Sequence, residues 1–427
     1  MKPIPQPDNE TSLLALRAMW RKRTLLAALE QFHHAKGDIF RVTLPGFFTV
    51  FMAGPEAARF VLVSQRENLL WRSEGDPVVK LLRHGVLVED GKAHDDLRQT
   101  MMPALHRKMV ESYAESMVTL TDEVIQHWHT GQPVEMLDEM RKIALLILTQ
   151  TLFGIDFKPD LEQMWQTVLK TIDYISPGLW IVWKRFPRLG YDRALRRMDA
   201  YLYHFIKQRR ARRSADVDMV SMLIEAGFSD ELIRDQLLTM LIAGHDTSTA
   251  LLAWALYALT THPDMLARAQ NEVDHVIGTD RPNVEHVKNL PYLGRVINET
   301  LRLYPPIHLS ARTAATDLQF SDYELPQNTR VIFSIYLTHR HPDYWSEPER
   351  FNPDRFEQSP APYTFLPFGG GKRNCIGTAF AQLESKLVLA RILQQFDLTF
   401  VGRPVRAYMK ATLEPYPGVT IQATPRR

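Results

Sequence analysis

Cysteine and long apolar segments are the scarcest features of this 427-residue sequence. Its single cysteine, Cys375, excludes an intramolecular disulfide and any zinc or iron–sulfur site built from several cysteines. No segment supplies the roughly 18 uninterrupted apolar residues that a membrane span requires. The nearest case, residues 240–259, contains His245 and Asp246. The formal net charge is only +2, so the composition gives no sign of nucleic-acid binding. We expect a soluble, cytoplasmic protein without a transmembrane segment.

Repeats, low-complexity tracts and Gly/Ser linkers are also lacking, so nothing marks a domain boundary. Length by itself suggests two domains. However, β-rich segments occur near both ends of the chain, at residues 38–53 and 318–356. Helical periodicity predicts helices at residues 92–102, 107–128, 137–153, 191–213, 229–260, 264–277, 290–303 and 376–396. We therefore predict one domain, residues 1–427, that is mainly α with a minor β region.

The only cysteine lies in an unusual loop, residues 365–377, which reads FLPFGGGKRNCIG. Three successive glycines do not suit a helix, but they let a backbone approach a flat ligand closely and adopt positive φ. A helix is predicted to begin near Gly377, and the N–H groups at a helix N-terminus lower a thiol pKa. Arg373 adds a cation two residues before Cys375. The loop thus indicates an anionic sulfur, although a lone cysteine more often serves as a small buried hydrophobic residue.

This loop resembles the F-x-x-G-x-R-x-C-x-G pattern of the cytochrome P450 family. All five fixed positions agree: Phe368, Gly371, Arg373, Cys375 and Gly377. The resemblance implies that the Cys375 thiolate is the axial ligand of haem b (iron protoporphyrin IX). It implies the P450 fold, in which the haem lies between a long central helix and the cysteine loop with the helix that follows. The implied activity is that of a haem-thiolate monooxygenase, which activates dioxygen to hydroxylate or epoxidise its substrate.

A second motif, residues 243–248 (AGHDTS), is predicted on a long helix and resembles the family's A-G-x-[DE]-T-[TS] segment. Ala243 and Gly244 precede Thr247 by four and three residues, so all three share one helix face, and two small side chains there leave room for a planar cofactor. Thr247 is able to bond back to the Ala243 carbonyl and open the helix locally. The resemblance implies that Asp246 and Thr247 relay protons during dioxygen activation. A polar interruption in a core helix explains the motif equally well.

A third pair, Glu299 and Arg302, lies three residues apart on a predicted helix. Such spacing usually indicates an exposed ion pair worth only tenths of a kcal/mol. The segment FNPDRF at residues 351–356, however, resembles the family's F-x-P-x-R-F element. The resemblance implies that Glu299, Arg302 and Arg355 form a buried structural network behind the haem that holds the cysteine loop.

The two carboxylates of a haem require cationic or hydrogen-bonding partners. His94 and Arg98, four residues apart, resemble the H-x-x-x-R form of the family's propionate-binding helix. Arg312 and Arg373 complete the set that the resemblance implies. Taken alone, His94 reads as an ordinary surface histidine.

The family resemblance also implies an electron donor in a separate protein, a ferredoxin or flavodoxin served by an NAD(P)H reductase. Such donors are typically acidic. Basic residues that could form a docking face are His106, Arg107, Lys108 and Lys372. Solvated surface charge explains each of them equally well.

Substrate identity is the least determined feature. Family position assigns the pocket to the loop at residues 78–88 and to five further residues: Met240, Ala243, Ile307, His308 and Leu309. These are mostly apolar, which favours a lipophilic small molecule. The segment at residues 176–186 contains Trp180 and Trp183 beside basic residues, and indicates either core packing or peripheral contact with a membrane surface.

Two other functions fit parts of the sequence. A haem-based sensor or electron carrier would keep the haem but lack oxygenase activity. Neither would need a proton-relay threonine on a long helix, and a sensor usually carries an output module. A cofactor-free helical binding protein would leave the cysteine loop unexplained.

Overall fold

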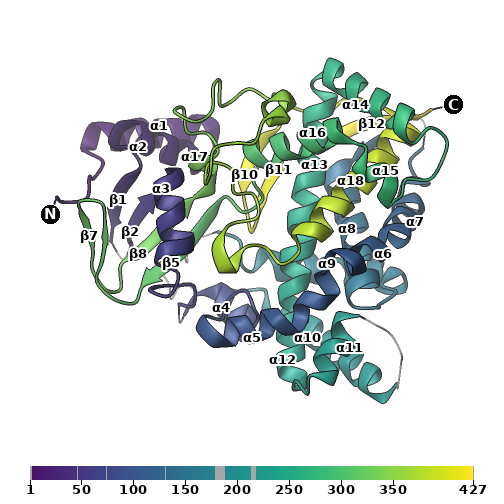
Figure 1. The fold of residues 1–427 in the computed structure, drawn as a ribbon, viewed down its shortest axis with the longest axis horizontal. Coiled ribbons are helices and arrows are strands. Elements are labelled where there is room, and N and C mark those ends of the chain that lie inside the picture. Colours follow the sequence, from purple (N-terminus) through teal and green to yellow (C-terminus); the bar gives the residue numbers. More distant parts are fainter. Residues whose placement is uncertain are drawn as a thin grey trace.

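The computed structural model describes residues 2–45, 47–73, 75–129, 131–177, 188–212 and 218–426. The predicted tryptophan-containing segment falls mostly on residues 178–187, outside the described residues. Figure 1 shows a sheet with α1 and α2 on one side of the molecule and most of the helices on the other. The predicted mainly α architecture with a minor β region is confirmed.

The principal sheet collects strands from distant parts of the chain. Its order is β1-β2-β8-β5-β3. The strands are β1 (Ile39–Leu44), β2 (Phe47–Met52), β3 (Leu69–Leu70), β5 (Leu309–Ala314) and β8 (Arg330–Ser334). β1 and β2 form an antiparallel hairpin within the β-rich segment predicted at residues 38–53, while β2 pairs in parallel with β8. A sheet that needs strands from both halves of the chain ties those halves into one structure.

Smaller sheets join the C-terminal strands. β4 (Pro133–Glu135), β12 (Thr420–Pro425) and β9 (Phe396–Phe400) form one, in the order β4-β12-β9. β10 (Arg406–Met409) pairs with β11 (Leu413–Tyr416), and β6 (Leu318–Phe320) pairs with β7 (Tyr323–Leu325).

The helices are α1 (Asn9–Lys22), α2 (Leu26–Lys36), α3 (Gly54–Arg59), α4 (Pro77–Leu82), α5 (Gly91–Met101), α6 (Arg107–Ser112), α7 (Ala114–Ile125), α8 (Met136–Leu152), α9 (Leu161–Asp173), α10 (Asp192–Ala211), α11 (Met219–Glu225), α12 (Asp230–Met240), α13 (Asp246–Thr260), α14 (Pro263–Val276), α15 (Val284–Lys288), α16 (Pro291–Leu303), α17 (Ile335–Thr338) and α18 (Thr378–Gln395). The helix predicted at 107–128 is divided into α6 and α7. The prediction does not include α1, α2, α3, α4, α9, α11, α15 and α17. Among the described residues, no helix is both long and apolar enough to cross a membrane.

The predicted helix at 229–260 runs through the centre of the molecule as α12, a π-helical segment at Leu241–His245, and α13 (Figure 1). α13 is buried almost all round, which explains why its sequence is apolar without a polar face. Trp254 anchors it: the indole stacks on Tyr304 with ring centroids 3.8 Å apart and donates a hydrogen bond to the Leu413 carbonyl at 2.8 Å. The central helix is thereby held against α16 and β11.

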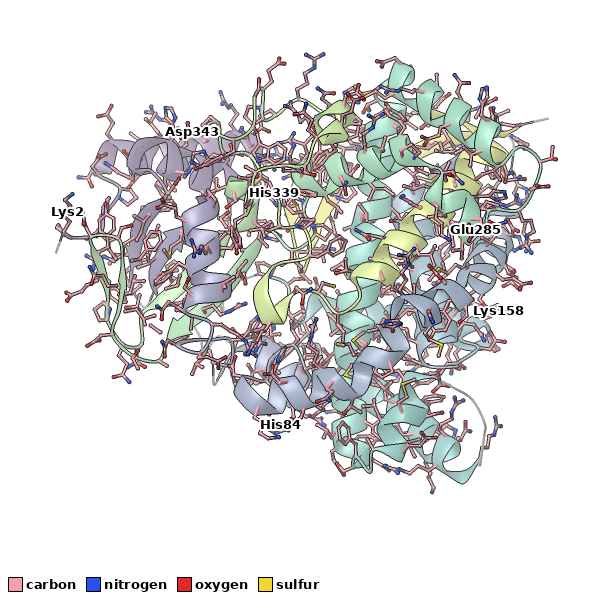
Figure 2. All side chains as sticks on the ribbon, in the orientation of Figure 1. Lys2, His84, Lys158, Glu285, His339 and Asp343 are labelled. Atoms are coloured by element: carbon pink, nitrogen blue, oxygen red, sulfur yellow. The ribbon has the colours of Figure 1, made fainter. Side chains whose placement is uncertain are left out.

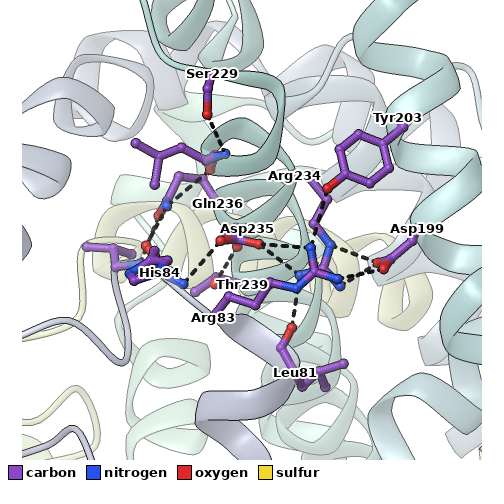
Figure 3. Close-up of polar contacts among 12 residues, drawn as sticks. Leu81, Arg83, His84, Asp199, Tyr203, Ser229, Arg234, Asp235, Gln236 and Thr239 are labelled. Carbon is purple, nitrogen blue, oxygen red and sulfur yellow. Dashed lines mark hydrogen bonds and ion pairs between the residues drawn. The ribbon is translucent and has the colours of Figure 1, made fainter.

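A polar network fastens α4 and the loop after it onto α12 and α10 (Figure 3). Arg234 Nη1 donates to the Leu81 carbonyl at 2.9 Å and to Asp235 Oδ1 at 2.9 Å, and its guanidinium also pairs with Asp199. Gln236 holds the loop in both directions, since its Oε1 accepts from Val86 N at 2.8 Å and its Nε2 donates to the His84 carbonyl at 2.9 Å. The loop predicted to border the substrate pocket is therefore tied to the central helix.

Candidate functional site

A cavity of about 1200 Å³ lies between the central helix and the cysteine loop. Fourteen predicted site residues line it: His94, Arg98, Met240, Ala243, Asp246, Thr247, Ile307, His308, Leu309, Arg312, Phe368, Arg373, Cys375 and Gly377. Gly371 and the predicted structural residues Glu299, Arg302 and Arg355 are not among the lining residues. The structure thus brings together, around one space, side chains that are separated by up to 283 positions in the sequence.

The cysteine loop is shaped by backbone contacts. Cys375 N donates to the Phe368 carbonyl at 2.8 Å, which closes the loop directly before α18. Gly371 has φ +64°, and a Cβ atom built there would lie 2.3 Å from the Leu62 carbonyl oxygen. A side chain at position 371 is therefore excluded both by backbone conformation and by contact with the segment after α3.

The Cys375 thiol does not have the lowered pKa that the helix N-terminus predicts. The Gly377 N–H and the Thr378 hydroxyl do favour the thiolate, but burial outweighs them and raises the pKa. The cation that favours the thiolate is Arg98, whereas Arg373 points to the loop before α5. Cys375 retains accessible surface where it lines the cavity. A metal cation at this sulfur would supply the positive charge that holds it deprotonated.

The central helix opens beside the cavity. Residues Leu241–His245 form a π-helical turn, and Thr247 Oγ1 donates to the Ala243 carbonyl at 2.6 Å, the bond expected from the four-residue spacing. Gly244 lines the cavity and also has a second role that the motif did not predict, since a Cβ atom there would lie 2.5 Å from Leu148 Cδ1 of α8. Its small size is required for helix packing as well as for space in the cavity.

Asp246 is buried and belongs to a chain of polar and charged side chains, of which Thr412 and Lys410 also line the cavity. Its Oδ2 accepts from Thr412 Oγ1 at 2.7 Å. Burial, and then the negative charge of Glu414, raise the pKa of Asp246 to about 6. Glu414 is itself paired with Arg141 at 2.7 Å and with Lys410 at 3.4 Å. A carboxyl with a pKa near 6 exchanges protons readily close to neutral pH.

One edge of the cavity is rich in positive charge. Burial, and then the positive charge of Arg373, lower the pKa of Arg312 to about 9, and the carboxylate of Asp90 compensates in part. His94 is also buried, and burial lowers its pKa even though Nδ1 donates to Asp95 Oδ1 at 2.8 Å. Both groups would be better satisfied next to an anion. The edge therefore fits a ligand that carries carboxylates.

Arg98 and Arg373 already make bonds that shape this edge. Arg98 donates to the Asn374 carbonyl at 2.7 Å and to Asn374 Oδ1 at 2.9 Å, next to Cys375. Arg373 donates to the Leu87 carbonyl at 2.8 Å and pairs with Asp90 at 3.0 Å. Each arginine therefore ties the cysteine loop to the α4–α5 region as well as lining the cavity.

A buried ionic network lies behind the loop. Glu299 and Arg302 are fully buried, with Arg302 Nε donating to Glu299 Oε2 at 2.7 Å and Nη2 donating to Oε1 at 2.8 Å. Arg355 Nε reaches Glu299 Oε1 at 3.3 Å. Arg302 Nη1 also donates to the His339 carbonyl at 2.9 Å, and His339 Nε2 accepts from Leu366 N at 2.8 Å. The network is thus joined to the start of the cysteine loop.

Sequence reasoning missed His339, because no motif marks it. Burial lowers its pKa to about 3, so the imidazole stays neutral and Nε2 remains an acceptor for the Leu366 N–H. Reasoning from motifs also missed one arm of the cavity, lined by side chains from α1, α2 and the β1–β2 hairpin, including Leu16, Phe47 and Phe51. Their apolar character alone does not distinguish them from core residues.

These features define a class of protein. A cysteine on a glycine loop, an opened helix across the cavity from it and a cationic edge that suits carboxylates are together the requirements of a haem-thiolate site. The residues present fit such a cofactor.

Comparison with known proteins agrees with this class. The family model "Cytochrome P450" matches residues 5–419. The chain is 31% identical to a putative cytochrome P450 139 of Mycobacterium tuberculosis, covering 92% of this chain and 96% of that protein. It is 30% identical to cyclooctat-9-en-7-ol 5-monooxygenase of Streptomyces melanosporofaciens, covering 91% and 87%. The structure of retinoic acid bound cyanobacterial CYP120A1 superposes with a TM-score of 0.87 at 25% identity, covering 100% of both chains. The chain belongs to the cytochrome P450 family, and it is a haem-thiolate monooxygenase that uses dioxygen and a redox partner.

Proposed function

We propose that this protein hydroxylates or epoxidises a lipophilic small molecule, using haem b bound through Cys375 and electrons from a separate ferredoxin or flavodoxin. The observation that carries the proposal is the position of Cys375 in the same cavity as the opened turn at Ala243 and Thr247. When bound, the haem supplies the iron at which dioxygen is reduced and activated. We further propose that residues 1–427 act as a single domain in the cytoplasm.

The cofactor's two carboxylates would be held by the cationic edge. Arg312 would gain a second counter-charge beside Asp90. The added negative charge would also favour the protonated form of His94, which donates from Nε2 as well as from Nδ1. Arg98 and Arg373 would add positive charge from the loop side. The ionic network of Glu299, through Arg302 and His339, would keep the cysteine loop in position.

Proton delivery is assigned to Thr247 and Asp246. Thr247 lines the cavity, and its hydroxyl donates its proton to the Ala243 carbonyl. Its oxygen can therefore accept a hydrogen bond from a bound ligand or water. Asp246, with its pKa near 6, would take protons from the Thr412 side and pass them toward position 247. Ile307 and Leu309 add apolar surface to the cavity, which would disfavour water beside the reacting atoms.

The substrate is proposed to be lipophilic because most pocket residues are apolar. Met240, Ala243, Ile307 and Leu309 line the cavity together with His308. His308 is buried and its pKa is lowered to about 4, so it acts as a neutral hydrogen-bonding group. The relative named for cyclooctat-9-en-7-ol and the retinoic-acid-bound neighbour support a mainly hydrocarbon ligand with few polar groups.

The redox partner is proposed to dock at exposed basic residues near the cysteine loop. His106, Arg107, Lys108 and Lys372 are all exposed, although Arg107 also pairs with Glu111 at 2.9 Å. An acidic donor would be attracted to such a face, with an association rate that falls as salt increases.

The test of the proposal is spectroscopic. The reduced, carbon-monoxide-bound protein should show the red-shifted Soret band of thiolate ligation, and a histidine-type spectrum or colourless protein would contradict it. Lipophilic compounds, retinoic acid included, should then be screened for a low-spin to high-spin shift. Retention of a haem-thiolate spectrum without turnover under any donor would favour the sensor or electron-carrier function.

A further inference from the structure

We propose that His33, Asp38 and His341 form a binding site for one divalent transition-metal cation, with Zn²⁺ the best match, separate from the site at Cys375. The three side chains each offer one ligand atom, and these atoms lie within 4.8 Å of one another. Two imidazoles and one carboxylate are a ligand set that binds Zn²⁺ with a water in the fourth position. Nothing in the monooxygenase function requires this cluster.

The three ligands converge on one point. His33 Nε2 lies 2.8 Å and His341 Nε2 lies 3.0 Å from the same oxygen, Asp38 Oδ1. The two rings are 5.3 Å apart between centroids and inclined at 72°, so they approach the carboxylate from different directions. Zn²⁺ with bonds of about 2.0–2.1 Å in tetrahedral geometry separates its ligands by roughly 3.3 Å. A cation therefore requires each of the two nitrogen–oxygen separations to lengthen by only a few tenths of an ångström, and the hydrogen-bond protons to leave.

The ligands come from rigid and separate segments. His33 lies in the last turn of α2, Asp38 directly precedes β1, and His341 follows α17. The Asp38 carboxylate rests against Gly54, where a Cβ atom would lie 2.8 Å from Oδ2. Gly54 is itself held by a bond from its N–H to Thr338 Oγ1 at 3.0 Å. The Asp38 carboxylate thus packs against the Gly54 backbone through Oδ2, while Oδ1 faces the imidazoles. Such packing holds a ligand in position before the cation binds.

A second carboxylate stands behind His341. In the hydrogen-bonded form, His341 Nδ1 accepts from Asp343 N at 3.2 Å, so the ring proton is on Nε2 and points to Asp38. Cation binding at Nε2 would move the ring proton to Nδ1. Asp343 Oδ2 lies 4.0 Å from Nδ1 and is placed to accept that proton in exchange for the N–H contact. Figure 2 labels Asp343 on the side of the molecule where α1 and α2 lie.

The location of the cluster at the protein surface gives a cation access from solvent and determines which segments the cation would connect. The Asp38 side chain is 44% exposed, which gives a cation and its water a route from solvent, while His341 is buried. A bound cation would cross-link His33 of α2 and Asp38 to the segment at His341, which lies 303 residues after Asp38. That segment begins two residues after His339, whose carbonyl accepts from Arg302. The inferred role is structural, fixing the N-terminal helices to the scaffold of the cysteine loop.

The experiment uses haem-loaded protein freed of any affinity tag. After treatment with a chelator and dialysis, the protein is equilibrated with chelator-buffered zinc sulfate, and zinc is measured by mass spectrometry relative to haem iron. One equivalent of zinc per haem is expected for the native chain. Asp38→Asn keeps an oxygen that accepts both imidazole bonds but is a poor zinc ligand, so it should weaken zinc binding at least about tenfold without unfolding the protein. His33→Ala should do the same.

His34→Ala is the matched control, because His34 is the exposed neighbour of His33 on the same helix. It should bind zinc like the native chain. Zinc should also raise the melting temperature of the native and His34→Ala proteins and leave that of Asp38→Asn unchanged. The proposal is overturned if the native chain takes up less than one equivalent, if Asp38→Asn and His33→Ala bind zinc as the native chain does, or if His34→Ala loses it. In those cases the cluster is a hydrogen-bonded clamp, or the zinc lies elsewhere.

Discussion

Glu299→Gln tests whether the contribution of the ionic network behind the cysteine loop to protein stability depends on its burial. The Glu299 carboxylate is fully buried and accepts four hydrogen bonds, two from Arg302, one from Asn352 N at 2.8 Å and one from Arg355. Glutamine keeps the shape but replaces one oxygen with an amide donor that faces arginine donors. It also leaves two guanidinium groups without their counter-charge. Loss of one partner from a buried ion pair costs about 3–5 kcal/mol, so we expect a destabilisation of that size.

The chain contains a matched control for this substitution. Glu285 pairs with Lys288 at 2.6 Å with the same three-residue spacing on a helix, but the two side chains are 76% and 45% exposed. Exposed pairs contribute at most about 1 kcal/mol, so Glu285→Gln should have little effect. Both variants would be unfolded in urea and followed by far-ultraviolet circular dichroism, with haem content measured in parallel. We expect Glu299→Gln alone to lower the urea midpoint and the haem content. Equal, small shifts in the two variants would refute the reasoning.

Three further outcomes are expected at the site. Thr247→Ala should retain haem and substrate binding but release more of the consumed reducing equivalents as hydrogen peroxide, while Thr247→Ser should not; unchanged coupling in Thr247→Ala would contradict the proton-relay role. Turnover should fall as the pH drops below about 6, because Asp246 becomes protonated there and no longer takes up protons. Asp246→Asn should be slower and lack that inflection in its pH profile, and the same inflection in both proteins would assign it to another group. Gly371→Ala should abolish haem retention, because the new Cβ would overlap the Leu62 carbonyl. Gly369→Ala is the control: no atom of the described residues lies within 4 Å of its Cβ position. It should therefore cost only the roughly 1–2 kcal/mol of a positive φ. Equal haem occupancy in the two alanine variants would argue against the steric explanation.

Sequence patterns were sufficient to predict the family and the fold class, and they pointed to the cysteine loop and the helix motif that the structure places around one cavity. The cysteine loop and the helix motif at Thr247 are local: each requires particular residues within a few positions, because loop closure and helical spacing are short-range constraints. The predicted bond from Thr247 to the Ala243 carbonyl is present for this reason. Periodicity also located longer helices such as α8, α10, α14 and α16. It did not locate α1, α2, α9 or the break between α6 and α7.

Only the tertiary structure decided the properties that depend on burial and on distant contacts. Glu299–Arg302 and Glu285–Lys288 have the same spacing in the sequence, and packing alone makes one pair buried and the other exposed. The Cys375 pKa was expected to fall at a helix N-terminus, but desolvation, which no local pattern reports, raises it. The link from Arg302 through His339 to Leu366 and the meeting of His33 with His341 join segments far apart in the chain. Such contacts arise from the way the elements pack, so a single sequence read by local rules does not contain them.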